Sequence, residues 1–156
     1  MCHPPAGTWG LLIAFAAFPV LWTLIRFTIA REPGSRKLDP QGTWNAFEPF
    51  LAKYLRIGEF IVGLAAGSIV LLLGSSVLRG NGGNLPSYFA SPLLLLGCCV
   101  GYGIAFMVWL TYHYEDYQHN STIHTRPAYV FSLTLGFSAF ACFFIGYAWL
   151  IFRFTR

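Results

Sequence analysis

Four long apolar runs restrict this chain to one class of fold. They lie at about residues 9–30, 57–79, 89–114 and 128–152, and short polar segments separate them. A helix needs about 20 mainly apolar residues to cross the hydrocarbon core of a bilayer. Charged residues make up only 10% of the sequence, whereas soluble domains contain about 25%. The sequence therefore predicts an all-α integral membrane protein with four transmembrane helices in an antiparallel bundle.

The segments between the runs predict a single domain. Residues 31–56 read as a polar linker followed by the start of an interfacial helix, in which Pro49 suits the first helical turn. From Pro49 the helical pattern continues without a breaker to Leu78, which is roughly 45 Å of helix at 1.5 Å per residue. We therefore expect residues 1–156 to form one four-helix domain, in which the second helix extends at its cytoplasmic end.

The distribution of Lys and Arg predicts the orientation, because cytoplasmic loops carry an excess of these residues. The first and third loops hold Arg31, Arg36, Lys37, Lys53, Arg56 and Arg126. The second loop and the C-terminal tail hold Arg79, Arg153 and Arg156. We expect the first and third loops in the cytoplasm and both termini on the non-cytoplasmic side. The basic residues do not form the stripe typical of nucleic-acid binding, so no nucleic acid is expected as a partner.

Small residues recur at helical spacing within three of the four runs. These candidate helix-packing ridges are Gly63 and Gly67, then Gly97, Gly101 and Ala105, then Ser138, Cys142 and Gly146; Ser132 and Gly136 repeat the pattern in the last run. Ridges of this kind allow two helix backbones to approach closely in lipid. They predict either contacts inside one chain or a seam with another chain, and the spacing does not choose between the two.

Polar residues with chemical potential gather near the predicted cytoplasmic ends of the helices. This polar rim comprises Arg26, Arg56, Glu59, His113, Glu115, Asp116 and His119. The centres of the runs contain no ionisable acid or base, which argues against an ion or proton pathway. The pairs His113/Asp116 and Glu115/His119 are each suited to two metal ligands, but neither supplies three. The alternative interpretation of the 113–119 stretch is a helix that emerges from the membrane into water.

Aromatic residues form a second feature of the third run. Tyr102, Phe106, Trp109 and His113 share one face at three-to-four spacing. Such a stripe is typical of helix packing, and the alternative is a surface beside a quinone, pigment or lipid. The sequence contains no phosphate-binding loop or haem-attachment motif. We predict no cofactor, and we expect bound lipid.

The layout is similar to that of the small membrane glutathione-transferase and eicosanoid enzymes. The arginine-rich glutathione-binding pattern of that family has no counterpart among these residues, so no membership is inferred.

We expect the protein to act by contact. It would be an accessory or scaffold subunit of a larger membrane complex, or a homo-oligomer, with membrane lipids as further partners. One alternative is a membrane-embedded enzyme that acts on a lipid-soluble substrate at the cytoplasmic interface through the polar rim. Another alternative is an oligomeric effector that perturbs the bilayer.

Overall fold

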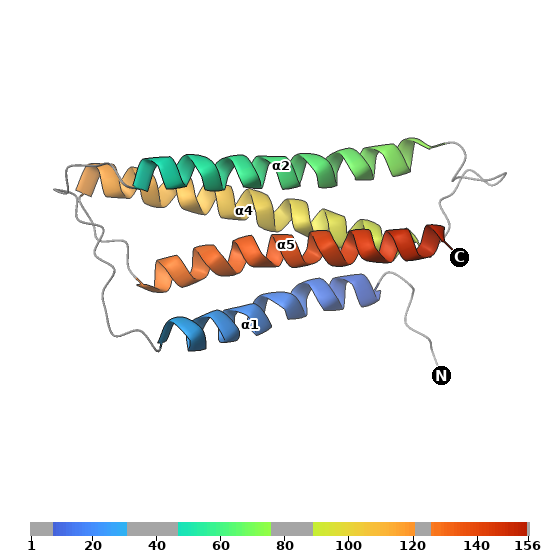
Figure 1. Ribbon diagram of the computed structural model, residues 1–156, viewed down its shortest axis with the longest axis horizontal. Helices are drawn as coiled ribbons and strands as arrows, with labels where there is room; N and C mark the ends of the chain where they lie inside the picture. Colours follow the sequence, from blue (N-terminus) through green and yellow to red (C-terminus); the bar gives the residue numbers. More distant parts are fainter. Residues whose placement is uncertain (1–7, 31–46, 76–88, 121–125, 156) are drawn as a thin grey trace.

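The computed structural model describes residues 8–30, 47–75, 89–120 and 126–155. These residues form four helices: α1 (Thr8–Ala30), α2 (Phe47–Gly74), α4 (Ala90–Asn120) and α5 (Arg126–Phe154) (Figure 1). The predicted all-helical class is confirmed for this part of the chain. The helix α2 begins ahead of the predicted second span, and α4 continues beyond the predicted end of the third span.

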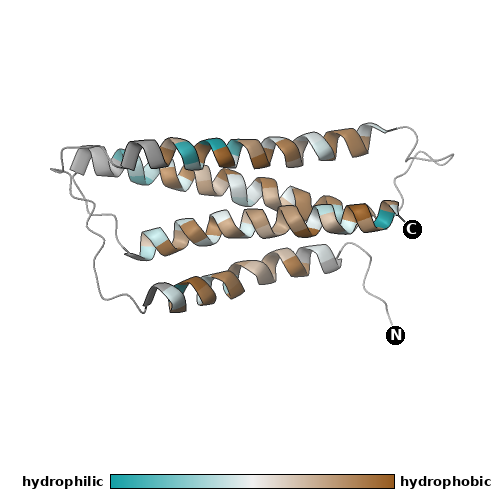
Figure 2. Cartoon of the chain, viewed as in Figure 1, coloured by the Kyte–Doolittle hydropathy of each residue, from teal (hydrophilic) through white to brown (hydrophobic). Residues whose placement is uncertain are grey.

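Three of these helices are long and apolar enough to cross a membrane. Their apolar stretches are Leu51–Gly74, Ala90–Glu115 and Pro127–Phe154, whereas the apolar stretch of α1 is the shorter Leu12–Thr28. Figure 2 shows apolar residues along most of each helix, with hydrophilic positions near the start of α2. Large apolar side chains such as Val70, at 68% exposure, lie on the outside. The structure thus supports a multi-pass membrane protein.

Several hydroxyl side chains within the helices bond to their own backbone, whereas the buried hydroxyl of Ser138 has no hydrogen-bond partner among the described residues. Thr134 donates a hydrogen bond to the carbonyl oxygen of Val130 at 2.7 Å, and Ser132 donates to that of Ala128 at 2.9 Å. Because lipid offers no hydrogen-bond partners, bonding back to the preceding turn allows a Ser or Thr to sit in an apolar helix. Polar residues of this kind are therefore compatible with a span.

The helix α4 lies at the centre of the fold. It packs against α1, α2 and α5, and α1 also packs along α5, while α2 has little contact with α5. The fully buried residues Leu95, Leu96 and Cys99 of α4 meet Ala65 of α2 and Cys142 of α5 in the core. The α4–α5 pair is thus the main packing unit, and α1 and α2 attach to it.

Contacts of individual residues define how the helices are aligned along one another. On α5, Gly136 lies beside Phe106, and Gly146 lies beside Leu95, so later residues of α5 meet earlier residues of α4. Between α1 and α4 the order is the same on both helices, because Gly10 lies against Ser91 and the hydroxyl of Tyr102 donates to the carbonyl oxygen of Ala14.

Candidate functional site

The predicted small-residue ridges on α2 and α4 face outward. A Cβ atom added to Gly63, Gly67, Gly97 or Gly101 would meet no atom within 4 Å. Ala105, the last member of the α4 ridge, is also exposed. These glycines therefore serve no packing contact among the described residues of the chain.

The predicted ridge on α5 faces inward instead. Ser138 is fully buried, Cys142 is 1% exposed, and Gly146 is buried as well. A Cβ atom on Gly146 would lie 3.3 Å from Cβ of Leu95, so this glycine permits the close packing of α5 on α4. The α5 ridge thus packs within the chain, whereas the α2 and α4 ridges lie on its open surface.

Other glycines at close contacts were not singled out from the sequence. A Cβ atom on Gly10 would lie 2.6 Å from the backbone oxygen of Ser91, closer than real Cβ atoms approach. Gly103 on α4 leaves room for the side chain of Val62 on α2, and Gly58 leaves room for Met107. These glycines do not repeat at four-residue spacing, so the ridge pattern gave no signal for them.

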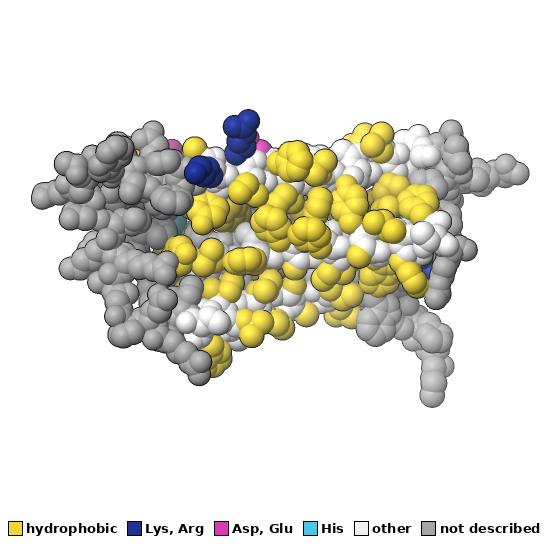
Figure 3. All heavy atoms as spheres, in the orientation of Figure 1, with side chains coloured by type: hydrophobic (Ala, Val, Ile, Leu, Met, Phe, Trp, Pro, Cys, Tyr) yellow, Lys and Arg dark blue, Asp and Glu magenta, His cyan; other side chains and the backbone are white. Residues whose placement is uncertain are grey.

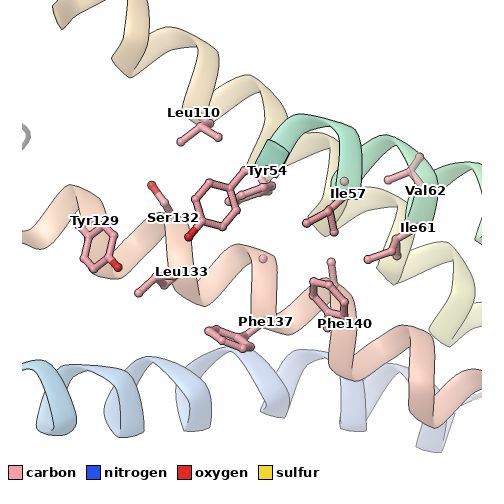
Figure 4. A pocket seen from close by; sticks show the side chains of 15 residues that line it. Tyr54, Ile57, Ile61, Val62, Leu110, Tyr129, Ser132, Leu133, Phe137 and Phe140 are labelled. Atoms are coloured by element: carbon pink, nitrogen blue, oxygen red, sulfur yellow. The ribbon is translucent and has the colours of Figure 1, made fainter. Parts of the chain in front are cut away.

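An apolar groove lies between α2 and α5, with α4 as its floor (Figure 4). The cavity has a volume of about 200 Å³. Ile57 and Ile61 of α2 form one wall, Phe137 and Phe140 of α5 form the other, and Phe106 of α4 lies at the base. The groove exists because α2 and α5 both pack on α4 but scarcely touch each other.

The groove continues outward along the same two helices. A second hollow, of about 580 Å³, shares Ile57, Ile61 and Phe140 with the first, and Lys53 and Arg56 line it as well. Figure 3 shows basic side chains over the start of α2, at one end of a largely apolar surface. We refer to the two hollows together as the α2–α5 groove.

Hydrogen bonds join α2 and α5 beyond the far end of this groove. The hydroxyls of Ser68 and Tyr147 are hydrogen-bonded to each other. The Tyr147 hydroxyl also donates to the carbonyl oxygen of Leu64, at 3.4 Å. The groove linings that lie furthest toward this bond are Leu64 and Phe144. We call the end lined by Lys53 and Arg56 the open end of the α2–α5 groove, and the end beyond which the Ser68–Tyr147 bond bridges the two helices its closed end.

The polar rim is distributed over three helices. Figure 1 shows that the end of α1, the start of α2 and the end of α4 lie at the same end of the molecule. Arg26, Arg56, Glu59 and Glu115 are exposed, and His113 is half-buried. Asp116 and His119 belong to the last turns of α4, but their side chains lie outside the described residues. No ion pair joins Arg56 to Glu59, although the structure describes both side chains.

The aromatic stripe of α4 packs against neighbouring helices. Tyr102 stacks on Phe18 of α1 with ring centroids 6.1 Å apart. Trp109 lies 4.5 Å from Phe131 of α5 and, in an edge-to-face arrangement, 4.5 Å from His113. These geometries are those that aromatic pairs prefer. His113 thus belongs to an aromatic cluster at the α4–α5 interface.

The structure does not assemble a metal centre from the side chains that it describes. Among them, no three His, Cys, Asp or Glu residues lie close enough together to hold a metal ion. Each predicted metal-binding pair, His113/Asp116 and Glu115/His119, has one member, Asp116 or His119, whose side chain lies outside those residues. Within the described part of the chain, the α2–α5 groove and the outward glycines are the features that most resemble binding surfaces.

Comparison with known proteins places the chain in no family. No protein-family model matches the sequence, no curated protein matches it, and no solved structure matches it. Functional inference therefore depends on the geometry of the chain itself.

Proposed function

We propose that this chain is a small integral membrane protein that crosses the bilayer four times and acts through contact with other membrane components. Its four helices would form one antiparallel bundle, with α1 as the first span. The helix α1 contains 23 residues, which corresponds to about 35 Å at 1.5 Å per residue. Its one charged residue, Arg26, lies near the helix end, where a long side chain reaches the interface.

The observation that carries the contact function is the outward position of the glycines on α2 and α4. Because lipid chains are as apolar as Leu, helices in a bilayer gain no hydrophobic advantage by associating. They associate where small residues permit close backbone approach and dense van der Waals packing. Gly97 and Gly101 leave open space on α4, while the neighbouring Ile104 and Val108 are large and exposed. This surface of shallow and raised positions suits a helix of a second copy or of a partner subunit.

Leucine at the outward glycines tests this proposal. In the Gly97→Leu/Gly101→Leu variant we expect the complex detected by cross-linking and by native mass spectrometry in mild detergent to be lost. The fold of the single chain should persist, because the new side chains enter open space. The matched control is Ala16→Leu/Ala148→Leu, which introduces leucine at exposed small residues of α1 and α5, outside the proposed contact surface.

Two results would overturn the contact function. The first would be a wild-type protein that is monomeric both alone and when captured from solubilised membranes. Alternatively, the Gly97→Leu/Gly101→Leu variant would associate as strongly as the control variant.

The proposed orientation places the polar rim in the cytoplasm. The excess of Lys and Arg in the first and third loops supports it. In the Glu115→Cys variant, the new thiol should react with a membrane-impermeant reagent only after the membrane is permeabilised. In the Arg153→Cys variant, it should react in intact cells. Both substitutions would be made in a chain in which the native cysteines are replaced by serine or alanine.

A further inference from the structure

We propose that the α2–α5 groove binds an anionic phospholipid of the surrounding bilayer, with an acyl chain in the groove and the phosphate beside Lys53 and Arg56. The inference rests on the membrane setting proposed above, and it names a ligand and a site that the contact function does not specify. Three independent features of the groove carry it: its lining, its charge and its length.

The lining of the groove suits an acyl chain. Both walls and the floor are apolar apart from a few hydroxyl groups, and Gly103 and Gly136 are among the lining residues. The hydroxyl of Ser132 is already bonded to its own helix, so it requires no polar partner from a ligand. A flexible hydrocarbon chain can make van der Waals contacts along such a lining and needs no polar partner of its own.

The charge at the open end selects the headgroup. Lys53 and Arg56 are the charged residues among the described groove linings, and both are exposed. Glu59 follows on the same helix, but it does not line the groove. A phosphate at this end would therefore meet an ammonium and a guanidinium group, which both bind phosphate oxygens well. A zwitterionic headgroup carries a cationic group of its own, which would lie close to these two basic residues.

The length of the groove favours a lipid chain over a helix of another protein. From Lys53 to Leu64 the groove follows α2 for roughly 17 Å at 1.5 Å per residue. One leaflet of the hydrocarbon core is about 15 Å deep, which is half of the full thickness. The Ser68–Tyr147 hydrogen bond closes the groove beyond that depth. A lipid chain ends at the middle of the bilayer, whereas a transmembrane helix would have to continue past this closed end.

Paired charge substitutions test the headgroup. The protein would be reconstituted in nanodiscs that contain both phosphatidylglycerol and phosphatidylcholine. Native mass spectrometry would then release the protein from the nanodiscs and count the lipids of each class that stay bound. In the Lys53→Gln/Arg56→Gln variant we expect the preference for phosphatidylglycerol to fall by about 30-fold, or about 5-fold for each cation. The control is Arg26→Gln/Arg153→Gln, which removes the same charge from exposed positions outside the groove and should leave the preference unchanged.

A groove-filling substitution tests the acyl chain. Ile57 lines both hollows and is 48% exposed, so Ile57→Trp would occupy the groove. We expect it to reduce the number of retained lipids of both classes. Val70→Trp is the control, because Val70 is exposed on the same helix but does not line the groove.

The possible outcomes separate this inference from the contact function. An unchanged lipid preference in Lys53→Gln/Arg56→Gln, or an equal loss in the charge control, would overturn the lipid site. An Ile57→Trp variant that loses a second copy of the chain and keeps its lipids would show that protein occupies the groove, and it would overturn the lipid site too. A chain that is not recovered in nanodiscs at all would instead refute the membrane setting.

Discussion

The contact between α1 and α4 at Gly10 provides the sharpest test of the packing. In the structure, a Cβ atom on this residue would lie 2.6 Å from the backbone oxygen of Ser91 and 3.1 Å from its Cα. Carbon and oxygen atoms in weak hydrogen-bonding contact are about 3.3 Å apart or more, so Gly10→Ala requires the helices to separate by roughly 0.7 Å. A backbone carbonyl inside a helix cannot rotate away from the new methyl group.

The expected cost follows from this geometry. Overpacking a close contact typically costs about 1–3 kcal/mol, and alanine returns up to about 1 kcal/mol through its higher helix propensity. In the monomeric protein, the control Gly97→Ala has the same propensity gain but no contact within the chain to disturb, because a Cβ atom there meets nothing within 4 Å. In a chain of this size 1 kcal/mol shifts the melting temperature by about 2–4 °C. We therefore expect Gly10→Ala to melt roughly 2–12 °C below Gly97→Ala.

Thermal unfolding in mild detergent, followed by circular dichroism, measures the difference between the two variants. Equal melting temperatures, or a higher one for Gly10→Ala, would refute the close approach of α1 to α4 at this point. The attachment of α1 to the rest of the bundle would then have to be different.

Three further predictions concern the interior of the bundle. Tyr147→Phe removes the two hydrogen bonds that join α5 to Ser68 and Leu64. Chemical denaturation should report a loss of about 1.2 kcal/mol, at an average of about 0.6 kcal/mol for each such bond between membrane helices. Cys99 and Cys142 are buried, at 0% and 1% exposure, so a maleimide should label them only after denaturation. Leu95→Ala opens a cavity at a fully buried site, and it should destabilise the protein by about 2 kcal/mol in the same denaturation assay. This is near the lower limit for Leu→Ala substitutions in soluble cores, because the side chain of the unfolded protein stays in lipid.

The helical class and the approximate positions of the helices could be predicted from the sequence because they depend on local pattern. Uninterrupted apolar runs determine where α2, α4 and α5 lie, and the early start of α2 follows from the helical spacing around Pro49. The four-span antiparallel arrangement and the orientation stay predictions, since they concern the membrane and the loops rather than the helices themselves.

The direction of the small-residue ridges could not be predicted from their spacing. Gly97 and Gly101 on α4 have the same four-residue period as Cys142 and Gly146 on α5, yet the first pair faces outward and the second faces α4. Spacing identifies residues that share a helix face, but it does not say which face meets a neighbour. That information depends on how the helices pack in three dimensions.

The α2–α5 groove was missed for a related reason. It lies between two helices that are far apart in the sequence, and its closed end is made by Ser68 and Tyr147, which are 79 positions apart. The sequence signal that could have pointed to it is modest: Lys53 and Arg56 lie one helical turn apart, just ahead of Ile57 and Ile61. Cations beside an apolar helix face are typical of surfaces that bind anionic lipids.

The central position of α4 has a consequence for biogenesis. The helices α1 and α2 are synthesised first, but they have little contact with each other: α2 packs mainly on α4, and α1 packs on both α4 and α5. If the chain inserts as proposed above, these two early segments reach their packing partners only after the second half of the chain has been made. The α4–α5 pair then provides the surface against which α1 and α2 pack, from different sides.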